Sequence, residues 1–155
     1  MKRYQVRLLA VVSLAALGLV VAAAGGASAA SRMSAPAVKT RNVKGLGVVL
    51  VNPKGRTLYV FMPDKQRHVT CTGSCAHYWP PLKWKGSSKP TAGGSAKSEL
   101  LGSDKDPAGG KVVTYDKWPL YTYVGDKAAG KATGQGLNAS GGKWYVISAA
   151  GKVVK

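Results

Sequence analysis

The sequence lacks the short motifs that mark the common catalytic sites. It contains no Gly-x-Ser-x-Gly, no His-Glu-x-x-His, no phosphate-binding loop and no dinucleotide-binding fingerprint. The hydrolases, zinc proteases and nucleotide-binding proteins that depend on those motifs are therefore excluded. We predict that the protein is not an enzyme and that it has no cofactor.

Acidic residues are also scarce: the chain has six Asp and Glu against 23 Lys and Arg, and its net charge is +17. No segment gathers the acids that a calcium-binding loop requires, so we expect no site of that kind. A glycoside hydrolase requires two carboxylates at a set separation, for which Asp64 and Asp126 are the candidates. We keep such a hydrolase as the weakest alternative, because both residues have a structural explanation in turns.

The first residues form the pattern of a secretory signal peptide. Basic residues such as Lys2 and Arg3 open the chain, an uncharged apolar stretch covers residues 8–21, and small residues follow up to Ala29. The apolar stretch is short for a bilayer crossing, which takes about 20 residues. We predict a signal peptide over residues 1–30 that is cleaved near Ala29. The mature protein is then secreted, extracellular or on the cell-envelope surface, with no transmembrane segment.

The charge of the mature chain indicates what kind of partner it meets. Removal of the three basic residues of the leader lowers the net charge from +17 to +14. Such a balance attracts anionic cell-wall polymers or lipid head groups. Because most of the basic residues are lysines scattered singly, and lysine lacks the bidentate fork of arginine, we expect diffuse, salt-sensitive attraction and no specific nucleic-acid site. A soluble, lysine-decorated surface is the alternative.

Two segments of the chain repeat each other. Residues 58–65 and 120–127 both read Leu-Tyr-x-aromatic-x-x-Asp-Lys, at an offset of 62. Further matches keep the same order: Thr72-Gly73 with Thr133-Gly134, and Trp79 with Trp144. We infer two copies of one unit. The predicted organisation is a signal peptide (1–30), a flexible leader (31–44) and a single β domain (45–155), which consists of repeat one (45–88), a polar linker (89–106) and repeat two (107–155).

Each copy has the pattern of a β-hairpin, because apolar residues alternate along short segments that turn residues separate. In the first copy, Asn52-Pro53-Lys54-Gly55 fits a type I turn between two apolar segments. In the second, Asp116-Lys117 separates residues 111–115 from residues 120–124. No segment of the mature chain has convincing helical periodicity. We therefore predict an all-β fold, a small antiparallel domain built from two similar hairpin repeats and preceded by a signal peptide.

The repeated aromatic residues and aspartates have two interpretations. Alternation along a strand places Tyr59 and Phe61 on one face, where they supply apolar area to a core. Asp64 then lies at the exit of the strand, where its carboxylate can cap backbone N–H groups of a turn. Alternatively, these residues and their counterparts line a ligand groove. The groove candidates are Tyr59, Phe61, Asp64, Trp79, Tyr121, Tyr123, Asp126 and Trp144.

Four side chains with metal-binding chemistry fall within ten residues: His68, Cys71, Cys75 and His77. A disulfide between the two cysteines is favoured, because exported proteins meet an oxidising compartment. The alternative is an exported protein that handles copper or zinc, or a redox-accessory protein, which uses all four side chains. The spacing is not that of a standard zinc finger, and no Cys-x-x-Cys at a helix start lowers a thiol pKa.

Several motifs in order resemble a known family. The repeated Tyr-x-aromatic-x-x-Asp is accompanied by Gly55-Arg56-Thr57-Leu58-Tyr59, by Cys71-Thr72-Gly73-Ser74-Cys75 before Trp79-Pro80-Pro81-Leu82, and by Gly134-Gln135-Gly136-Leu137-Asn138 before Gly142-Lys143-Trp144-Tyr145-Val146. This combination resembles the secreted repeat of unknown function, also described as predicted bacterial lipoproteins with that motif. The resemblance covers about residues 45–155 and implies a cell-envelope or extracellular location without an activity. No lipid-acceptor cysteine lies near the predicted cut, so the lipid anchor does not transfer.

These patterns together favour a secreted, non-enzymatic binding module of the cell envelope. Its basic surface would hold it near anionic wall polymers. Its aromatic strands would form either the core or a shallow groove.

Overall fold

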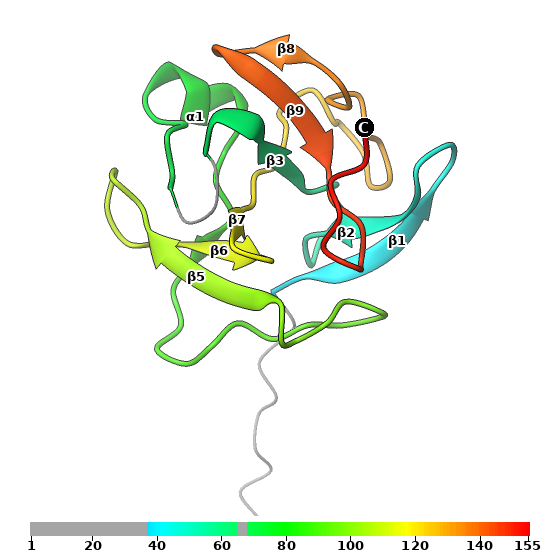
Figure 1. The fold of residues 1–155 in the computed structure, drawn as a ribbon, viewed down its shortest axis with the longest axis horizontal. Helices are drawn as coiled ribbons and strands as arrows, with labels where there is room; N and C mark the ends of the chain where they lie inside the picture. Colours follow the sequence, from blue (N-terminus) through cyan, green and yellow to red (C-terminus); the bar gives the residue numbers. More distant parts are fainter. Residues whose placement is uncertain (1–36, 65–67) are drawn as a thin grey trace, which may run out of the picture. The chain divides into compact units, whose positions relative to one another are not determined.

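The structure is a computed structural model, and it describes residues 37–64 and 68–155 (Figure 1). The prediction of an all-β antiparallel fold is confirmed, with two short helical segments added. The predicted signal peptide and its cleavage near Ala29 lie outside the described residues. The strands are β1 (Lys39–Val43), β2 (Gly47–Val51), β3 (Tyr59–Phe61), β4 (Lys83–Trp84), β5 (Leu101–Lys105), β6 (Lys111–Tyr115), β7 (Trp118–Pro119), β8 (Asn138–Ala139) and β9 (Gly142–Val146), and the helical segments are the 3-10 helix η1 (Met62–Asp64) and the α-helix α1 (Ser74–Tyr78).

The strands form three small sheets. β1 and β2 make a hairpin, β3 pairs with β9 and β9 with β8, and β6 lies between β4 and β5 and also pairs with β7. Every pairing between these named strands is antiparallel. Because the strands are only two to five residues long, each sheet is small, and the core between the sheets must supply most of the stability.

Two turns form where the sequence predicts them. Asn52 begins the first, accepting the N–H of Gly55 at its carbonyl (2.9 Å) and the N–H of Lys54 at its side-chain oxygen (3.0 Å). The second joins β6 to β7 through Asp116 and Lys117, whose φ angles are 45° and 67°. A two-residue hairpin with positive φ at both positions twists in the same sense as the strands it joins, which explains why this turn closes so tightly.

The two repeats are interleaved. β3 of repeat one pairs along its whole length with β9 of repeat two, with Phe61 opposite Trp144. Tyr59 also forms a backbone bridge with Tyr121 of repeat two. The N–H of Tyr59 donates to the carbonyl of Tyr121 at 2.8 Å, and the N–H of Tyr121 donates to the carbonyl of Tyr59 at 3.0 Å. Neither repeat is therefore a separate layer, and each completes its backbone hydrogen bonding on the other.

Two predicted boundaries are corrected by the structure. The segment 31–44, expected to be a flexible leader, contains β1, and Val38 just before it is fully buried. The sequence of β1 does not show the apolar alternation of a strand, because only Val43 of its five residues is buried. The segment 89–106, expected to be a linker, contains β5, which pairs with β6 from Leu101 to Lys105. As an edge strand with polar residues along it, β5 has no apolar run that marks it.

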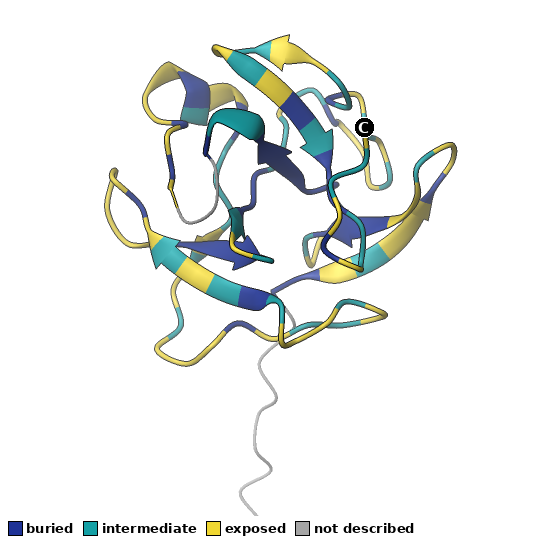
Figure 2. Ribbon diagram, in the orientation of Figure 1, coloured by how far each residue is buried: buried dark blue, intermediate teal, exposed yellow. Residues whose placement is uncertain are grey.

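The buried residues form two cores, which the alternation along β3 separates. β3 itself is buried along its whole length (Figure 2). Val60 points into a mainly aliphatic core with Leu50, Leu58 and Leu120. Its two neighbours on β3 point the other way, into a cluster that we call the aromatic core. The aromatic core consists of the rings of Tyr59, Phe61, Trp79, Tyr121, Tyr123 and Trp144. No helix among the described residues is long and apolar enough to span a membrane.

Candidate functional site

The tyrosine hydroxyl of each repeat forms a hydrogen bond with the aspartate of the other repeat. The hydroxyl of Tyr59 donates to Asp126 Oδ2 at 2.7 Å, and the hydroxyl of Tyr121 donates to Asp64 Oδ2 at 2.5 Å. Both aspartates and both tyrosines are buried, with at most 1% of their surface exposed. Hydrogen bonds to charged acceptors are the stronger kind, so these two pairs fasten the repeats together across their contact.

A threonine completes each pair. Thr70 donates both its backbone N–H (2.8 Å) and its hydroxyl (2.7 Å) to Asp64 Oδ1. Thr133 makes the same two bonds, at the same two distances, to Asp126 Oδ1. The two carboxylates are thus surrounded by donors, as buried acceptors require. This arrangement fits the interpretation of the aspartates as caps of a turn, and it leaves neither carboxylate facing a cleft where a hydrolase would need it.

Burial raises the pKa values of Tyr59, Asp64 and Tyr121. The pKa of Asp64 is raised because burial disfavours its charged form, although the bonds from Tyr121 and Thr70 work in the opposite direction. The pKa of Tyr59 is raised chiefly by burial and then by its bond to Asp126. The pKa of Tyr121 is raised by burial and by the charge of Asp64. Both phenols therefore stay protonated, and donate, over the whole physiological pH range.

The rings of the aromatic core stack in a defined order. Tyr123 lies on Trp79 (centroids 4.2 Å apart), Trp79 on Trp144 (3.9 Å) and Trp144 on Phe61 (4.3 Å). The planes of the two indoles differ by only 1°. Each indole thus packs on an aromatic ring of the other repeat. The stack therefore joins the two repeats, as the tyrosine–aspartate pairs do.

The predicted groove residues therefore lie together, but they fill a core. Seven of the eight are buried, and Tyr123, the eighth, is half-buried. Gly134 packs directly on this cluster, since an added Cβ there would lie 2.7 Å from Trp79 and 3.1 Å from Tyr59. The space beside the rings is filled by the protein itself.

The predicted disulfide between Cys71 and Cys75 is confirmed. Their Cα atoms are 5.2 Å apart, within the usual range for such a bridge. The bridge joins the loop before α1 to α1 itself and packs against Trp79 in the aromatic core. In this state neither sulfur offers a thiolate to a metal ion.

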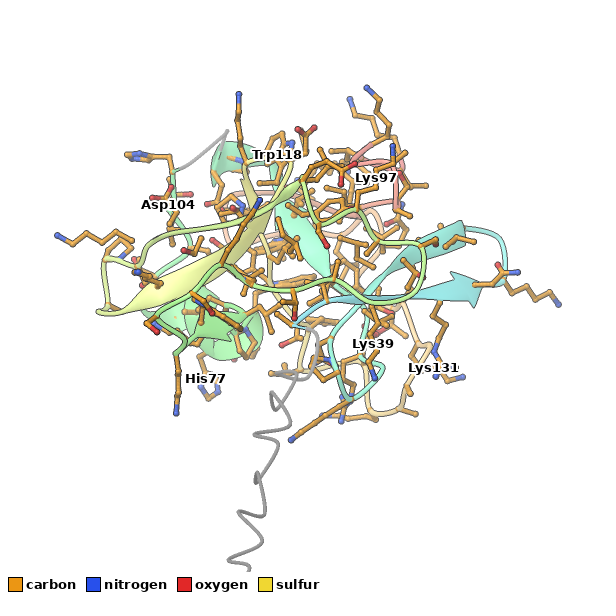
Figure 3. The ribbon with its side chains drawn as sticks, turned by 90° about the horizontal axis from the view of Figure 1, so that it is seen from below. Lys39, His77, Lys97, Asp104, Trp118 and Lys131 are labelled. Carbon is orange, nitrogen blue, oxygen red and sulfur yellow. A yellow bond between two sulfur atoms is a disulfide. The ribbon has the colours of Figure 1, made fainter. Side chains whose placement is uncertain are left out.

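The two histidines of the same loop lie at the surface. His68 and His77 are both exposed, and Figure 3 shows His77 projecting from the domain. His77 meets the exposed Tyr78 edge-on at 5.2 Å. Within the described residues, no three His, Cys, Asp or Glu side chains form a group that could hold a metal ion. Copper or zinc binding at this loop would therefore have to begin with reduction of the disulfide.

A surface hollow beside the β1–β2 hairpin gathers basic side chains. We call it the basic hollow; it has a volume of about 310 Å³ and no acidic residue in its wall. Arg41 lies over the turn that closes it, since an added Cβ at Gly55 would come within 3.3 Å of the Arg41 guanidinium. Its wall is formed by Lys39, Thr40, Arg41, Val51, Asn52, Pro53, Lys54 and Gly55.

Sequence reasoning missed three features of these sites. It matched Thr72 with Thr133, whereas the structure gives Thr70 the role that Thr133 has in the second repeat. It did not predict that the tyrosine of each repeat bonds to the aspartate of the other. The signal was the motif itself, in which both copies carry a tyrosine and an aspartate at the same spacing. It also missed the basic hollow, because Lys39 and Arg41 lie in the segment taken for a leader.

Comparison with known protein families also finds two repeats in the chain. The profile of a family described as secreted repeat of unknown function matches residues 40–83 and, a second time, residues 102–148. The two matches cover more than half of the chain, and each contains one tyrosine and one aspartate of the exchanged pairs. The chain belongs to this family of secreted repeats. Neither a curated protein nor a solved structure matches it.

Proposed function

We propose that the protein is a non-enzymatic module that binds anionic polymers of the cell envelope through its basic surface. The observation that carries this proposal is the accumulation of unpaired basic side chains on that surface. All the lysines among the described residues are exposed, and of these only Lys83 forms an ion pair, with Asp106. Charges that are neither paired nor buried attract polyanions most strongly at low salt.

The positions of the acids strengthen this attraction. Asp64, Asp106 and Asp126 are buried and hold hydrogen bonds inside the fold, so they contribute little to the surface. The remaining acids line one other hollow, of about 440 Å³, along β5 and the β6–β7 turn: Glu99, Asp104 and Asp116. The β1–β2 side of the domain is thus left with basic residues.

The basic hollow is the part of the surface that we propose as the contact for the polymer. Lys39, Arg41 and Lys54 converge there, and the loop that carries Lys131 lies beside the hollow, since the N–H of Gly130 donates to the carbonyl of Gly55 at 3.1 Å. Figure 3 shows Lys39 and Lys131 on the same side of the domain. Lysines act as point charges, so such a contact suits the repeated phosphates or carboxylates of a flexible polymer better than one precisely held group.

A variant and a matched control test this proposal. Lys39→Gln/Arg41→Gln/Lys54→Gln removes the charges of the basic hollow. The control Lys85→Gln/Lys105→Gln/Lys111→Gln removes the same number, from the residue after β4 and from β5 and β6. Each protein is sedimented with purified cell walls, with walls stripped of their anionic polymer, and with vesicles of anionic lipid. We expect the first variant to lose most of the wall binding and the control to keep most of it.

Four outcomes would overturn the proposal. Equal loss in both variants would mean that net charge acts without a preferred surface. Undiminished binding to stripped walls, or binding that persists in 1 M salt, where the Debye length is about 3 Å, would mean that charge is not the cause. Stronger binding to anionic vesicles than to walls would assign the surface to lipid head groups.

A further inference from the structure

The order of the rings in the aromatic core gives a continuous path for single electrons. Tyr123, Trp79, Trp144 and Phe61 stack face to face at centroid distances of 4.2, 3.9 and 4.3 Å. Indole and phenol are, after thiols, the side chains that give up one electron most readily. Rings in van der Waals contact exchange electrons rapidly, and Tyr123, at one end of the stack, is the ring that reaches the surface.

Two tyrosines contact this path, and each has a proton acceptor within hydrogen-bond distance. Tyr59 and Tyr121 meet the two indoles edge-on, at 5.4 and 5.3 Å. Their hydroxyls donate to Asp126 and Asp64 at 2.7 and 2.5 Å. A phenol gives up an electron at a moderate potential only if its proton leaves at the same time. Here the proton has a carboxylate within hydrogen-bond distance, so it can move without water.

The geometry points to a redox function of the aromatic core: it accepts one oxidising equivalent from a one-electron oxidant, such as an oxidised transition-metal ion or an oxyl radical, and stores it as a neutral tyrosyl radical at Tyr59 or Tyr121. This function is independent of polymer binding. It makes the protein a trap for single oxidising equivalents that arise at the cell envelope.

The step balances with the groups present. The oxidant takes one electron from the stack through Tyr123, which leaves an indole radical cation at Trp79 or Trp144. The neighbouring phenol returns an electron to the indole, and its proton passes to the carboxylate to which it is bonded. The products are the reduced oxidant, a tyrosyl radical and a neutral carboxylic acid. A one-electron reductant such as an enediol or a hydroquinone restores the resting state, and the proton then returns to the phenolate.

Burial suits the core to this function. Tyr59, Tyr121 and Trp144 have no exposed surface and Trp79 only 1%, so a radical held there is kept from coupling with a second molecule. Burial also raises the pKa of Asp64, which favours the neutral acid that the step produces.

Flash oxidation of the protein purified from the culture medium tests this inference. A photo-oxidised ruthenium tris-bipyridine complex supplies the oxidant, and optical and paramagnetic resonance spectra distinguish tyrosyl from tryptophanyl radicals. We expect a long-lived tyrosyl radical whose yield falls to about half in Tyr59→Phe and in Tyr121→Phe. In the double variant we expect only a short-lived tryptophanyl radical. Tyr115→Phe is the matched control, because that buried hydroxyl donates to the carbonyl of Ala149 and not to a carboxylate.

The interpretation is overturned if the double variant, folded by near-ultraviolet circular dichroism, retains the yield and lifetime of the unaltered protein. It is also overturned if Tyr115→Phe reduces them equally. Should the double variant fail to fold, Trp79→Phe/Trp144→Phe decides, since it keeps the tyrosine–aspartate pairs and removes the indoles. We expect slower formation of the tyrosyl radical in that variant, and an unchanged rate would refute the path.

Discussion

Replacement of Tyr59 by phenylalanine should destabilise the domain far more than the loss of one hydroxyl suggests. The substitution keeps the ring, and with it the edge-on contact with Trp79. It removes the donor to Asp126 Oδ2 at 2.7 Å, and the N–H of Gly134, which donates to the same hydroxyl at 3.2 Å, also loses its partner. Asp126 is 1% exposed, so water cannot replace the lost donor without disturbing the core.

The expected magnitude follows from the kind of group that is left unpaired. A buried neutral group without a partner costs about 1–3 kcal/mol, and a charged group costs more. The bond of Tyr59 is made to a buried carboxyl group that keeps its two bonds from Thr133, so we expect a loss of about 3 kcal/mol in the free energy of unfolding.

Urea denaturation of the unaltered protein, Tyr59→Phe, Tyr121→Phe and Tyr115→Phe measures these losses. Tyr121→Phe should cost nearly as much as Tyr59→Phe, because its hydroxyl makes the equivalent bond to Asp64. Tyr115→Phe removes the hydroxyl of another buried tyrosine, which bonds only to backbone groups, and it should cost about 1 kcal/mol. A loss in Tyr59→Phe no larger than that in Tyr115→Phe would refute the importance of the exchanged pairs.

Three further predictions follow from the same contacts. Because the pKa values of Tyr59 and Tyr121 are raised above 10.0 in the folded state, their contribution is complete below pH 10 and is lost above it, when the unfolded phenols ionise; the free energy of unfolding should fall by about 1.4 kcal/mol per pH unit for each tyrosine, and the fall should be smaller in Tyr59→Phe/Tyr121→Phe. Cys71→Ala/Cys75→Ala should lower the free energy of unfolding by about 2 kcal/mol, the chain-entropy value for so short a loop, and an unchanged melting temperature would contradict this. Gly134→Ala should destabilise by at least about 1–3 kcal/mol, since its Cβ would lie 2.7 Å from the buried indole of Trp79, and a variant as stable as the unaltered protein would show that the rings are less closely packed.

The parts of the fold that could be predicted are those with local signals. The Asn52 turn, the repeat at an offset of 62 and the cysteine pair each depend on residues close in sequence or on direct identity between segments. β1 and β5 were missed because both lie at the edge of a sheet, where one or both faces are polar and the alternation is lost. Edge strands of this composition have the same pattern as loops.

The contacts of the candidate site were harder to predict, because they join segments that are far apart in sequence. Alternation along β3 correctly predicts that Tyr59 and Phe61 share a face, but it cannot show what that face meets. That the rings meet their counterparts from the other repeat depends on the pairing of β3 with β9, between segments about 85 residues apart in sequence. The role of Thr70 was missed for a simpler reason. Thr70 lies six residues after Asp64 and Thr72 lies eight, whereas Thr133 lies seven after Asp126, so spacing does not distinguish the two threonines; the glycine that follows both Thr72 and Thr133 favoured Thr72.

The exchange of tyrosines between the two repeats is best tested by the through-space contacts of their hydroxyl protons in nuclear magnetic resonance spectra. Buried hydroxyls that donate to carboxylates exchange slowly enough with water to be observed. If the repeats are interleaved as described, the hydroxyl proton of Tyr59 lies close to Thr133 and that of Tyr121 close to Thr70. Contacts of each hydroxyl with the threonine of its own repeat, or rapid exchange of both protons with water, would contradict the structure on which the account rests.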